Sequence, residues 1–165
     1  VRAYHHREKI FQTLALGDEV GLLCSHLDQL GASAHGVDQS AAAITLAQLR
    51  YAAGVFRRAD IRDLPFDRAS FDAAWTASVL CRLPRDQSLK ALQEVHRVLR
   101  MGAVLAVNLL TGPGQEWEAT AFGPVYACRW TVNDFAAACD ALDMQMIENL
   151  QVGPGCQALL FRREY

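Results

Sequence analysis

Short apolar runs alternate with amphipathic stretches along most of the chain. Five of these runs are predicted to be strands, at residues 10–16, 33–37, 54–57, 71–75 and 103–110. The stretches between most of them reach about a dozen residues, which is long enough for a crossover helix. The alternation therefore predicts βαβ units, with five parallel strands joined by right-handed crossovers.

The amphipathic stretches carry helical spacing and helix-boundary residues. A leucine stripe over residues 23–30 is followed by Gly31, a residue type that commonly ends a helix. Ser40 is predicted to cap a second helix. A third helix is expected to have Asp86 as its cap and to end at residues 101–102. The apolar stripe of this third helix is Leu89, Leu92, Val95 and Leu99.

The alternation breaks after residue 110. After residues 111–114, Thr-Gly-Pro-Gly, the apolar residues show no clear helical or strand spacing until Trp130. This predicts a loop of roughly 20 residues. Such a length exceeds what a connection needs and is typical of a functional element. We expect this loop to cover the substrate side of a pocket.

The C-terminal part predicts one helix and two strands. Thr131 has the properties of an N-cap, and Trp130 and Phe135 have the spacing of a hydrophobic staple. The runs 144–150 and 157–161 are predicted strands, and the Gly-Pro-Gly turn between them predicts an antiparallel hairpin.

The composition narrows the class of protein. A length of 165 residues with 52% hydrophobic residues suits one core, so we expect a single Rossmann-like domain over residues 1–165. The predicted fold class is α/β, a doubly wound, mainly parallel seven-stranded sheet with helices on both faces and a C-terminal antiparallel hairpin. A formal charge of -2 gives no broad basic field, which disfavours nucleic acid and membrane partners. No apolar run approaches the roughly 18 residues of a membrane helix, and we expect a cytoplasmic protein.

The cysteines and histidines point to no metal site. The five cysteines are odd in number and include no C-x-x-C pair, which argues against a disulfide framework and a zinc knuckle. The five histidines show no ligand spacing. Both residue types are interpreted as core or surface residues, and no metal is expected.

Three blocks of the sequence resemble one known family. They read ADIRDLPF at residues 59–66, SFDAAWTASVL at 70–80 and EVHRVLRMG at 94–102. In order and spacing they are similar to class I S-adenosylmethionine-dependent methyltransferases, in particular the small-molecule, ubiquinone-biosynthesis-like branch. The resemblance spans about residues 14–162 and implies S-adenosyl-L-methionine as cofactor and a small molecule as methyl acceptor.

The resemblance also implies a set of cofactor-binding residues. A ligand of an open parallel sheet lies beyond the carboxyl ends of the strands, and most of these residues lie just after predicted strands. Asp38 would accept hydrogen bonds from the ribose hydroxyls and Asp60 one from the adenine amino group. Gln39 and Ile61 would pack on the adenine faces, and Thr76 would lie near the methionine part. The full set is Gly17, Glu19, Gly21, Asp38, Gln39, Asp60, Ile61 and Thr76.

Each carboxylate also has a plain structural interpretation. An aspartate that follows a strand is often a turn former or the cap of the next helix, and this alternative stays open for Asp38. For Asp60 a role in a turn competes with the ligand role in the same way.

Three departures from the family pattern bear on activity. The first loop has Ala15 where the family has an acid and Glu19 where it has a glycine, at a point of close approach to the ligand. Residues 80–84, Leu-Cys-Arg-Leu-Pro, lack the histidine that many members carry, so no general base is evident. About nine residues precede the first strand, which implies an open site.

Two functions follow from these patterns. The leading hypothesis is S-adenosylmethionine-dependent methyl transfer to a small molecule, which proximity and alignment can promote without a base. The alternative is a non-catalytic binding or scaffold subunit with weakened cofactor binding. A nicotinamide-binding oxidoreductase ranks last, because residues 17–21 do not supply G-x-G-x-x-G. The sequence leaves a homodimer open and does not identify a catalytic residue.

Overall fold

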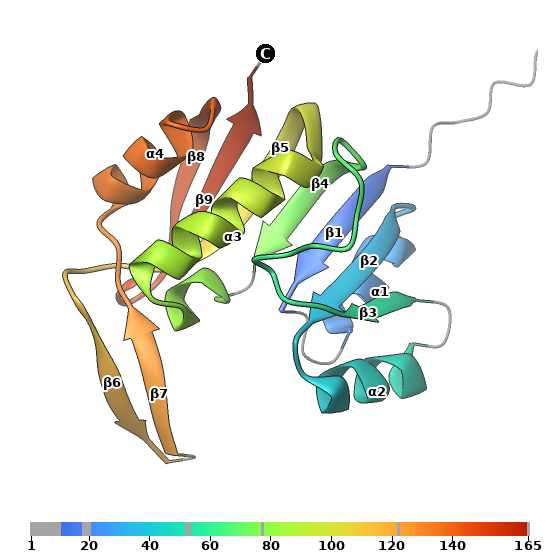
Figure 1. Ribbon diagram of the computed structural model, residues 1–165, viewed down its shortest axis with the longest axis horizontal. Helices are drawn as coiled ribbons and strands as arrows, with labels where there is room; N and C mark the ends of the chain where they lie inside the picture. Colours follow the sequence, from blue (N-terminus) through green and yellow to red (C-terminus); the bar gives the residue numbers. More distant parts are fainter. Residues whose placement is uncertain (1–10, 18–20, 52–53, 77, 122, 165) are drawn as a thin grey trace, which may run out of the picture.

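The computed structural model describes residues 11–164 except 18–20, 52–53, 77 and 122. Its main sheet runs in the order β3-β2-β1-β4-β5-β9-β8 (Figure 1). The strands β1 to β5 are parallel, and β9 and β8 form the antiparallel hairpin at one edge. The predicted fold class is thereby confirmed. The strands are β1 (Gln12–Leu16), β2 (Ser33–Asp38), β3 (Val55–Arg58), β4 (Phe71–Thr76), β5 (Leu99–Leu110), β8 (Met144–Gly153) and β9 (Cys156–Arg163).

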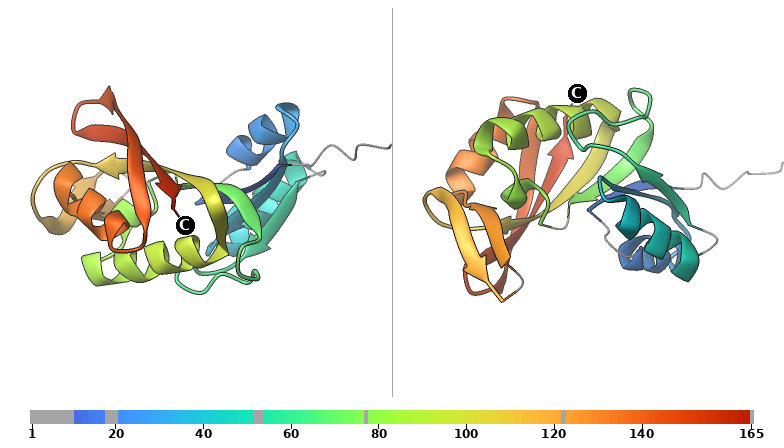
Figure 2. Two further views of the ribbon diagram at one scale, coloured as in Figure 1. Left: turned by 90° about the horizontal axis from the view of Figure 1, so that it is seen from above. Right: turned by 60° about the horizontal axis from the view of Figure 1, so that its bottom comes forward.

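Helices cover the two faces of this sheet (Figure 2). The pair α1 (Leu22–Gln29) and α2 (Ala41–Arg50) packs Cys24 and Ala47 on one face, around Phe56 of β3. The pair α3 (Arg85–Val98) and α4 (Val132–Asp140) packs on the other face, in the larger core that holds Leu14 and Leu105. A short 3-10 helix, η1 (Leu80–Arg82), precedes α3.

Two predicted helix caps are confirmed. The Ser40 hydroxyl accepts a hydrogen bond from the Ala43 amide at 3.3 Å, and the Thr131 hydroxyl accepts one from the Asp134 amide at 3.1 Å. Each bond satisfies an amide that the first helical turn leaves without an intrahelical partner.

The predicted limits of the long helix are wrong at both ends. Pro84 is the N-cap of α3, and Asp86 lies in the first turn without capping it. There its charge still favours the positive end of the helix dipole. The helix ends at Val98, and β5 begins directly at Leu99, so residues 101–102 belong to the strand.

The predicted loop after β5 is instead a second β-hairpin, formed by β6 (Gln115–Thr120) and β7 (Gly123–Cys128). It projects from the body of the molecule beside η1 (Figure 1). Most side chains of β6 are exposed. Because β6 has little buried surface and β7 is fully buried only at Ala127 and Cys128, the sequence of this ribbon lacks the alternation of apolar and polar residues that reveals a half-buried strand.

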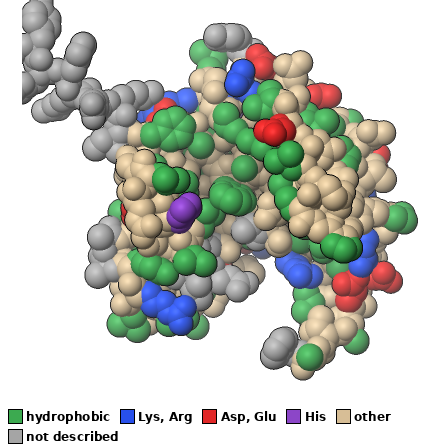
Figure 3. All heavy atoms as spheres, turned by 180° about the vertical axis from the view of Figure 1, so that it is seen from behind, with side chains coloured by type: hydrophobic (Ala, Val, Ile, Leu, Met, Phe, Trp, Pro, Cys, Tyr) green, Lys and Arg blue, Asp and Glu red, His purple; other side chains and the backbone are tan. Residues whose placement is uncertain are grey.

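The face of the sheet that carries α1 and α2 also has an apolar hollow of about 340 Å³. Figure 3 shows hydrophobic side chains gathered in this region. Trp75 and Val104 are among its lining residues, and none of the described lining residues is charged. No helix in the described part of the chain is long and apolar enough to cross a membrane.

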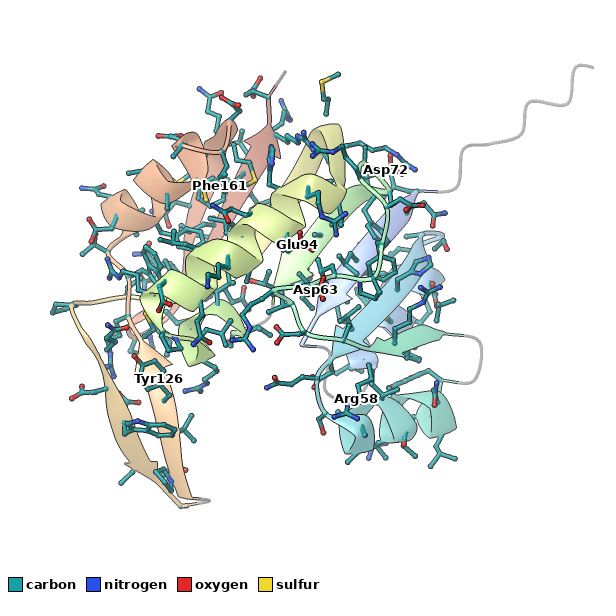
Figure 4. All side chains as sticks on the ribbon, viewed as in Figure 1. Arg58, Asp63, Asp72, Glu94, Tyr126 and Phe161 are labelled. Carbon is teal, nitrogen blue, oxygen red and sulfur yellow. The ribbon has the colours of Figure 1, made fainter. Side chains whose placement is uncertain are left out.

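The segment between β3 and β4 is irregular, and a charged clamp on α3 holds it. Glu94 accepts a hydrogen bond from the Leu64 amide at 2.8 Å and pairs with Arg97 at 2.7 Å. Arg97 in turn donates to the carbonyl oxygens of Leu64 and Phe66 at 2.9 and 2.8 Å. Figure 4 shows Glu94 on α3 close to the segment that carries Asp63. The clamp therefore supplies the hydrogen bonds that this segment does not make within itself.

The Arg97 guanidinium, helped by the Leu64 amide, holds the pKa of Glu94 below its ordinary value of 4.5 against an opposing effect of burial. A depressed pKa stabilises the fold above the ordinary value, and this stabilisation is lost as the pH falls through the folded-state pKa. We expect Glu94→Gln to lower the free energy of unfolding at pH 7 by about 2 kcal/mol.

Urea unfolding between pH 7 and pH 3 measures this effect. The curves of the parent and of Glu94→Gln should converge below pH 4.5, because the parent then loses the same charge. Glu148→Gln, on an exposed residue of β8, is the matched control and should change little. Parallel curves for the parent and Glu94→Gln across this range would contradict the clamp.

Candidate functional site

The order of the strands reverses between β1 and β4. The strands β2 and β3 follow β1 on one side, and β4 and β5 lie on the other side. At such a point the loops beyond the carboxyl ends diverge and leave a crevice. A pocket of about 290 Å³ lies there, and we call it the strand-end pocket. Its described lining residues are Leu16, Gly17, Val37, Asp38, Gln39, Ala59, Asp60, Ile61, Ser78, Val79, Arg82 and Leu83.

The structure brings five of the eight predicted cofactor-binding residues together in this pocket. They come from the ends of β1, β2 and β3, and they are Gly17, Asp38, Gln39, Asp60 and Ile61. Gly17 has a φ of 71°, a left-handed conformation that favours glycine, and its amide donates to the Val37 carbonyl at 2.9 Å. Gly17 therefore follows β1 hydrogen-bonded to β2, with a backbone conformation that a residue with a side chain rarely adopts.

The other three predicted residues do not line the pocket or lie outside the described residues. Gly21 is the N-cap of α1 with a φ of 73°, and a Cβ there would come within 2.8 Å of Phe56. Thr76 is fully buried beside Leu16, and its hydroxyl has no partner among the described residues. Glu19 lies outside the described residues.

Asp38 ends β2 and is half-buried at the pocket wall. One of its carboxylate oxygens accepts a hydrogen bond from the Ser40 amide at 2.8 Å. This is the turn-forming contact of the structural interpretation. A carboxylate has about four acceptor positions, so the contact leaves capacity for hydroxyl donors from a ligand.

Asp60 is bound to Arg62. The Arg62 side chain donates to both carboxylate oxygens, with Nε at 2.8 and 3.0 Å, and its Nη1 reaches Gln87 on α3 at 2.6 Å. The hydrogen bonds from Arg62 lower the pKa of Asp60, although partial burial opposes them. The residue is thus an ionised, positioned acceptor and a poor proton acceptor in catalysis.

Ser78 follows β4 at the pocket and has a φ of 61°, which is uncommon for a residue other than glycine. Its carbonyl accepts a hydrogen bond from the Cys81 thiol at 2.9 Å. The Ser88 hydroxyl holds the same turn through the Leu80 carbonyl at 2.7 Å. The surrounding contacts therefore maintain a strained backbone at the pocket wall.

Arg82 forms the side of the pocket beyond β4. Its guanidinium donates to the Tyr126 carbonyl on β7 at 3.4 Å, so it joins the pocket to the β6–β7 hairpin. Figure 4 shows Tyr126 on this hairpin. Sequence reasoning missed both Ser78 and Arg82, because their roles depend on a backbone torsion and on a hairpin that the sequence pattern does not reveal.

The described pocket wall offers no neutral base. His26, His35 and His96 do not line the pocket. Cys81 is fully buried, and burial raises the pKa of its thiol. Among the described residues, no cluster of histidine, cysteine and acidic side chains could hold a metal ion. The arrangement can bind and align reactants, and it offers carboxylates on one side and a cation on the other.

The strain at Ser78 leads to a stability prediction. A residue with a side chain costs about 1–2 kcal/mol in the left-handed conformation, and glycine removes this cost. Glycine also loses more conformational freedom on folding, which offsets about 0.5–1 kcal/mol of the gain. We expect Ser78→Gly to raise the free energy of unfolding by about 0.5–1 kcal/mol in urea titrations. Ala69→Gly, at a φ of 55° away from the pocket, is the matched control and should gain as much. A loss confined to Ser78→Gly would mean that the serine side chain outweighs its strain.

Comparison with known proteins agrees with this geometry. Residues 14–107 match the family model of the methyltransferase domain. A S-adenosylmethionine-dependent methyltransferase from Methanosarcina mazei has a TM-score of 0.84 at 16% identity, over 95% of this chain and 94% of that chain. A protein from Pyrococcus horikoshii has a TM-score of 0.83 at 17% identity, over 96% and 84%.

A third structure similar to this chain contains ligands. It is a 1,6-didemethyltoxoflavin-N1-methyltransferase from Burkholderia thailandensis with bound 1,6-didemethyltoxoflavin and S-adenosylhomocysteine. Its TM-score is 0.77 at 18% identity, over 94% of this chain and 72% of that chain. The family model covers more than half of the 165 residues, and the chain shares its fold with the similar structures. The chain therefore belongs to the methyltransferase domain family, as a class I S-adenosylmethionine-dependent methyltransferase.

Proposed function

We propose that this protein transfers a methyl group from S-adenosylmethionine to a small-molecule acceptor and that the strand-end pocket holds the methyl donor. The observation that carries the proposal is the position of the Asp38 carboxylate at the carboxyl end of β2, in a pocket at the reversal of strand order. Ligands of open parallel sheets bind at this point.

The described residues fit the proposed donor. Asp38 would accept hydrogen bonds from the ribose hydroxyls, and the ionised Asp60 would accept one from the adenine amino group. Ile61 and Gln39 would pack against the adenine ring. Gly17 has no side chain and lines the pocket, so its backbone would be able to approach the ligand closely. Bound S-adenosylmethionine supplies a methyl group that is already activated on a sulfonium.

The residues of this chain would then act mainly by positioning. The end of β4 and η1 border the side of the pocket away from Asp38 and Asp60, where an acceptor would lie. Holding two reactants in alignment can lower a barrier by several kcal/mol without proton transfer. This division into a donor half and an acceptor half needs no general base on the described wall.

One observation favours a second function, a binding or scaffold subunit with weakened cofactor binding. Ala15 occupies the position where the resemblance implies an acid, and it is fully buried against the core of α1 and α2. This strand position therefore gives the donor no carboxylate. Calorimetry with S-adenosylmethionine and S-adenosylhomocysteine separates the two functions, because silence at millimolar ligand would favour the scaffold.

We expect Asp38→Ala to weaken S-adenosylhomocysteine binding by about 10- to 100-fold, since a charge-assisted hydrogen bond contributes roughly 1.5–3 kcal/mol. Isothermal titration measures the affinity, and thermal unfolding verifies the fold. Asp140→Ala, on an exposed residue at the end of α4, is the control and should bind as the parent does. Unchanged affinity in a folded Asp38→Ala protein would remove this residue from the site.

A further inference from the structure

The charges of the strand-end pocket are divided between its two sides. The carboxylates of Asp38 and Asp60 lie at the ends of β2 and β3, whereas Arg82 follows β4. Arg82 is the one cationic side chain among the described lining residues. The pocket therefore has an acidic donor half and a cationic acceptor half.

Arg82 is less engaged than the neighbouring arginines. Arg62 is bound by both oxygens of Asp60, and Arg58 donates to the Gln39 carbonyl at 2.9 Å. Arg82 has a single contact at 3.4 Å, to the Tyr126 carbonyl, and no carboxylate partner within the described ranges. Its guanidinium has five donors, so most of them are available to a ligand.

The hairpin strand whose backbone Arg82 contacts carries one residue of an aromatic pair. Trp117 on β6 lies directly across the hairpin from Tyr126, and their rings meet edge to face with centroids 5.5 Å apart. Trp117 is 70% exposed, so its ring is accessible to a flat ligand.

The hairpin is also joined to the start of α3. The Tyr126 hydroxyl donates to Gln115 at 2.9 Å, and Gln115 also accepts from the Arg85 amide at the start of α3 at 3.2 Å. The hairpin that carries the aromatic pair is thus joined to η1 through Arg82 and to α3 through Gln115.

We propose that Arg82 and the pair Trp117–Tyr126 form the acceptor site and that the acceptor is a flat ring acid bound as its anion. This inference rests on the proposed function. Arg82 would attract the negative oxygen or sulfur atom, and the aromatic rings would contact the flat ring.

The anionic state of the acceptor replaces the missing base. The acceptor loses its proton to solvent before transfer, so no side chain has to remove it. Its lone pair then forms the bond to the methyl carbon while the carbon–sulfur bond of the donor breaks, and the electron pair of that bond stays on sulfur. The products are the neutral methylated acceptor and a thioether, and the charges balance.

The test uses 4-nitrophenol as a probe, because its anion absorbs visible light and its methyl ether, 4-nitroanisole, is the neutral counterpart. A neighbouring guanidinium should lower the pKa of the bound phenol by about one unit. This is the smallest effect expected of a nearby opposite charge, because Arg82 is exposed to solvent. Spectroscopic titration of the probe with the protein, without any methyl donor, reads this shift directly.

We expect Arg82→Gln to abolish the shift and to weaken binding of the nitrophenolate about tenfold, with binding of 4-nitroanisole unchanged. Arg82→Lys should retain part of the shift, and Arg68→Gln, on an exposed residue of the turn before β4, is the control for net charge. Trp117→Ala should weaken binding of the nitrophenolate and of 4-nitroanisole to the same degree. An unchanged titration in Arg82→Gln would overturn the role of Arg82.

Calorimetry with S-adenosylhomocysteine distinguishes this inference from the proposed function. If the cofactor product binds and the nitrophenolate does not, the acceptor class is wrong while the methyltransferase function stands. If the nitrophenolate binds through Arg82 and S-adenosylhomocysteine does not bind, the anion site stands and the proposed function fails.

Discussion

The strand-end pocket depends on the clamp between Glu94, Arg97 and the segment that joins β3 to β4. No helix spans this connection in the described residues, so its backbone groups need partners from elsewhere. Both side chains come from α3. Arg97 donates hydrogen bonds to two carbonyl oxygens of the segment, and Glu94 accepts one from an amide. The clamp holds the end of the segment while Arg62 fixes its start through Asp60 and Gln87. Both contacts connect the side of the pocket that carries Asp60 and Ile61 to α3.

The same dependence gives Glu94 and Arg97 a larger effect on the structure than a surface ion pair has. Glu94 and Arg97 lie three residues apart, so they share one side of α3. Their ion pair alone would contribute little at the surface. They have a greater effect because each is also bound to the backbone of a segment that has no regular structure of its own.

Much of the fold was predictable from sequence because burial imposes a period on it. The five parallel strands, the C-terminal hairpin and the caps at Ser40 and Thr131 follow from apolar runs and from residues with one dominant local role. The hairpin β6–β7 was not predictable, since most side chains of β6 face solvent and β7 is buried mainly at Ala127 and Cys128, so neither strand shows a clear alternation. The limits of α3 were wrong because the strand follows the helix without a break at Leu99.

The candidate site divides in the same way. Gly17, Asp38 and Asp60 were predictable, because they follow strands whose ends meet at one edge of the sheet. Arg82 and Ser78 were not, because the sequence shows neither the torsion at residue 78 nor the neighbour of residue 82. In physical terms, the side of the pocket with Asp38 and Asp60 rests on strand ends that the core fixes. The side with Ser78 and Arg82 rests on the irregular backbone after β4 and on one contact with a projecting hairpin. The backbone there depends on contacts between segments far apart in the sequence, so sequence patterns describe this side of the pocket least.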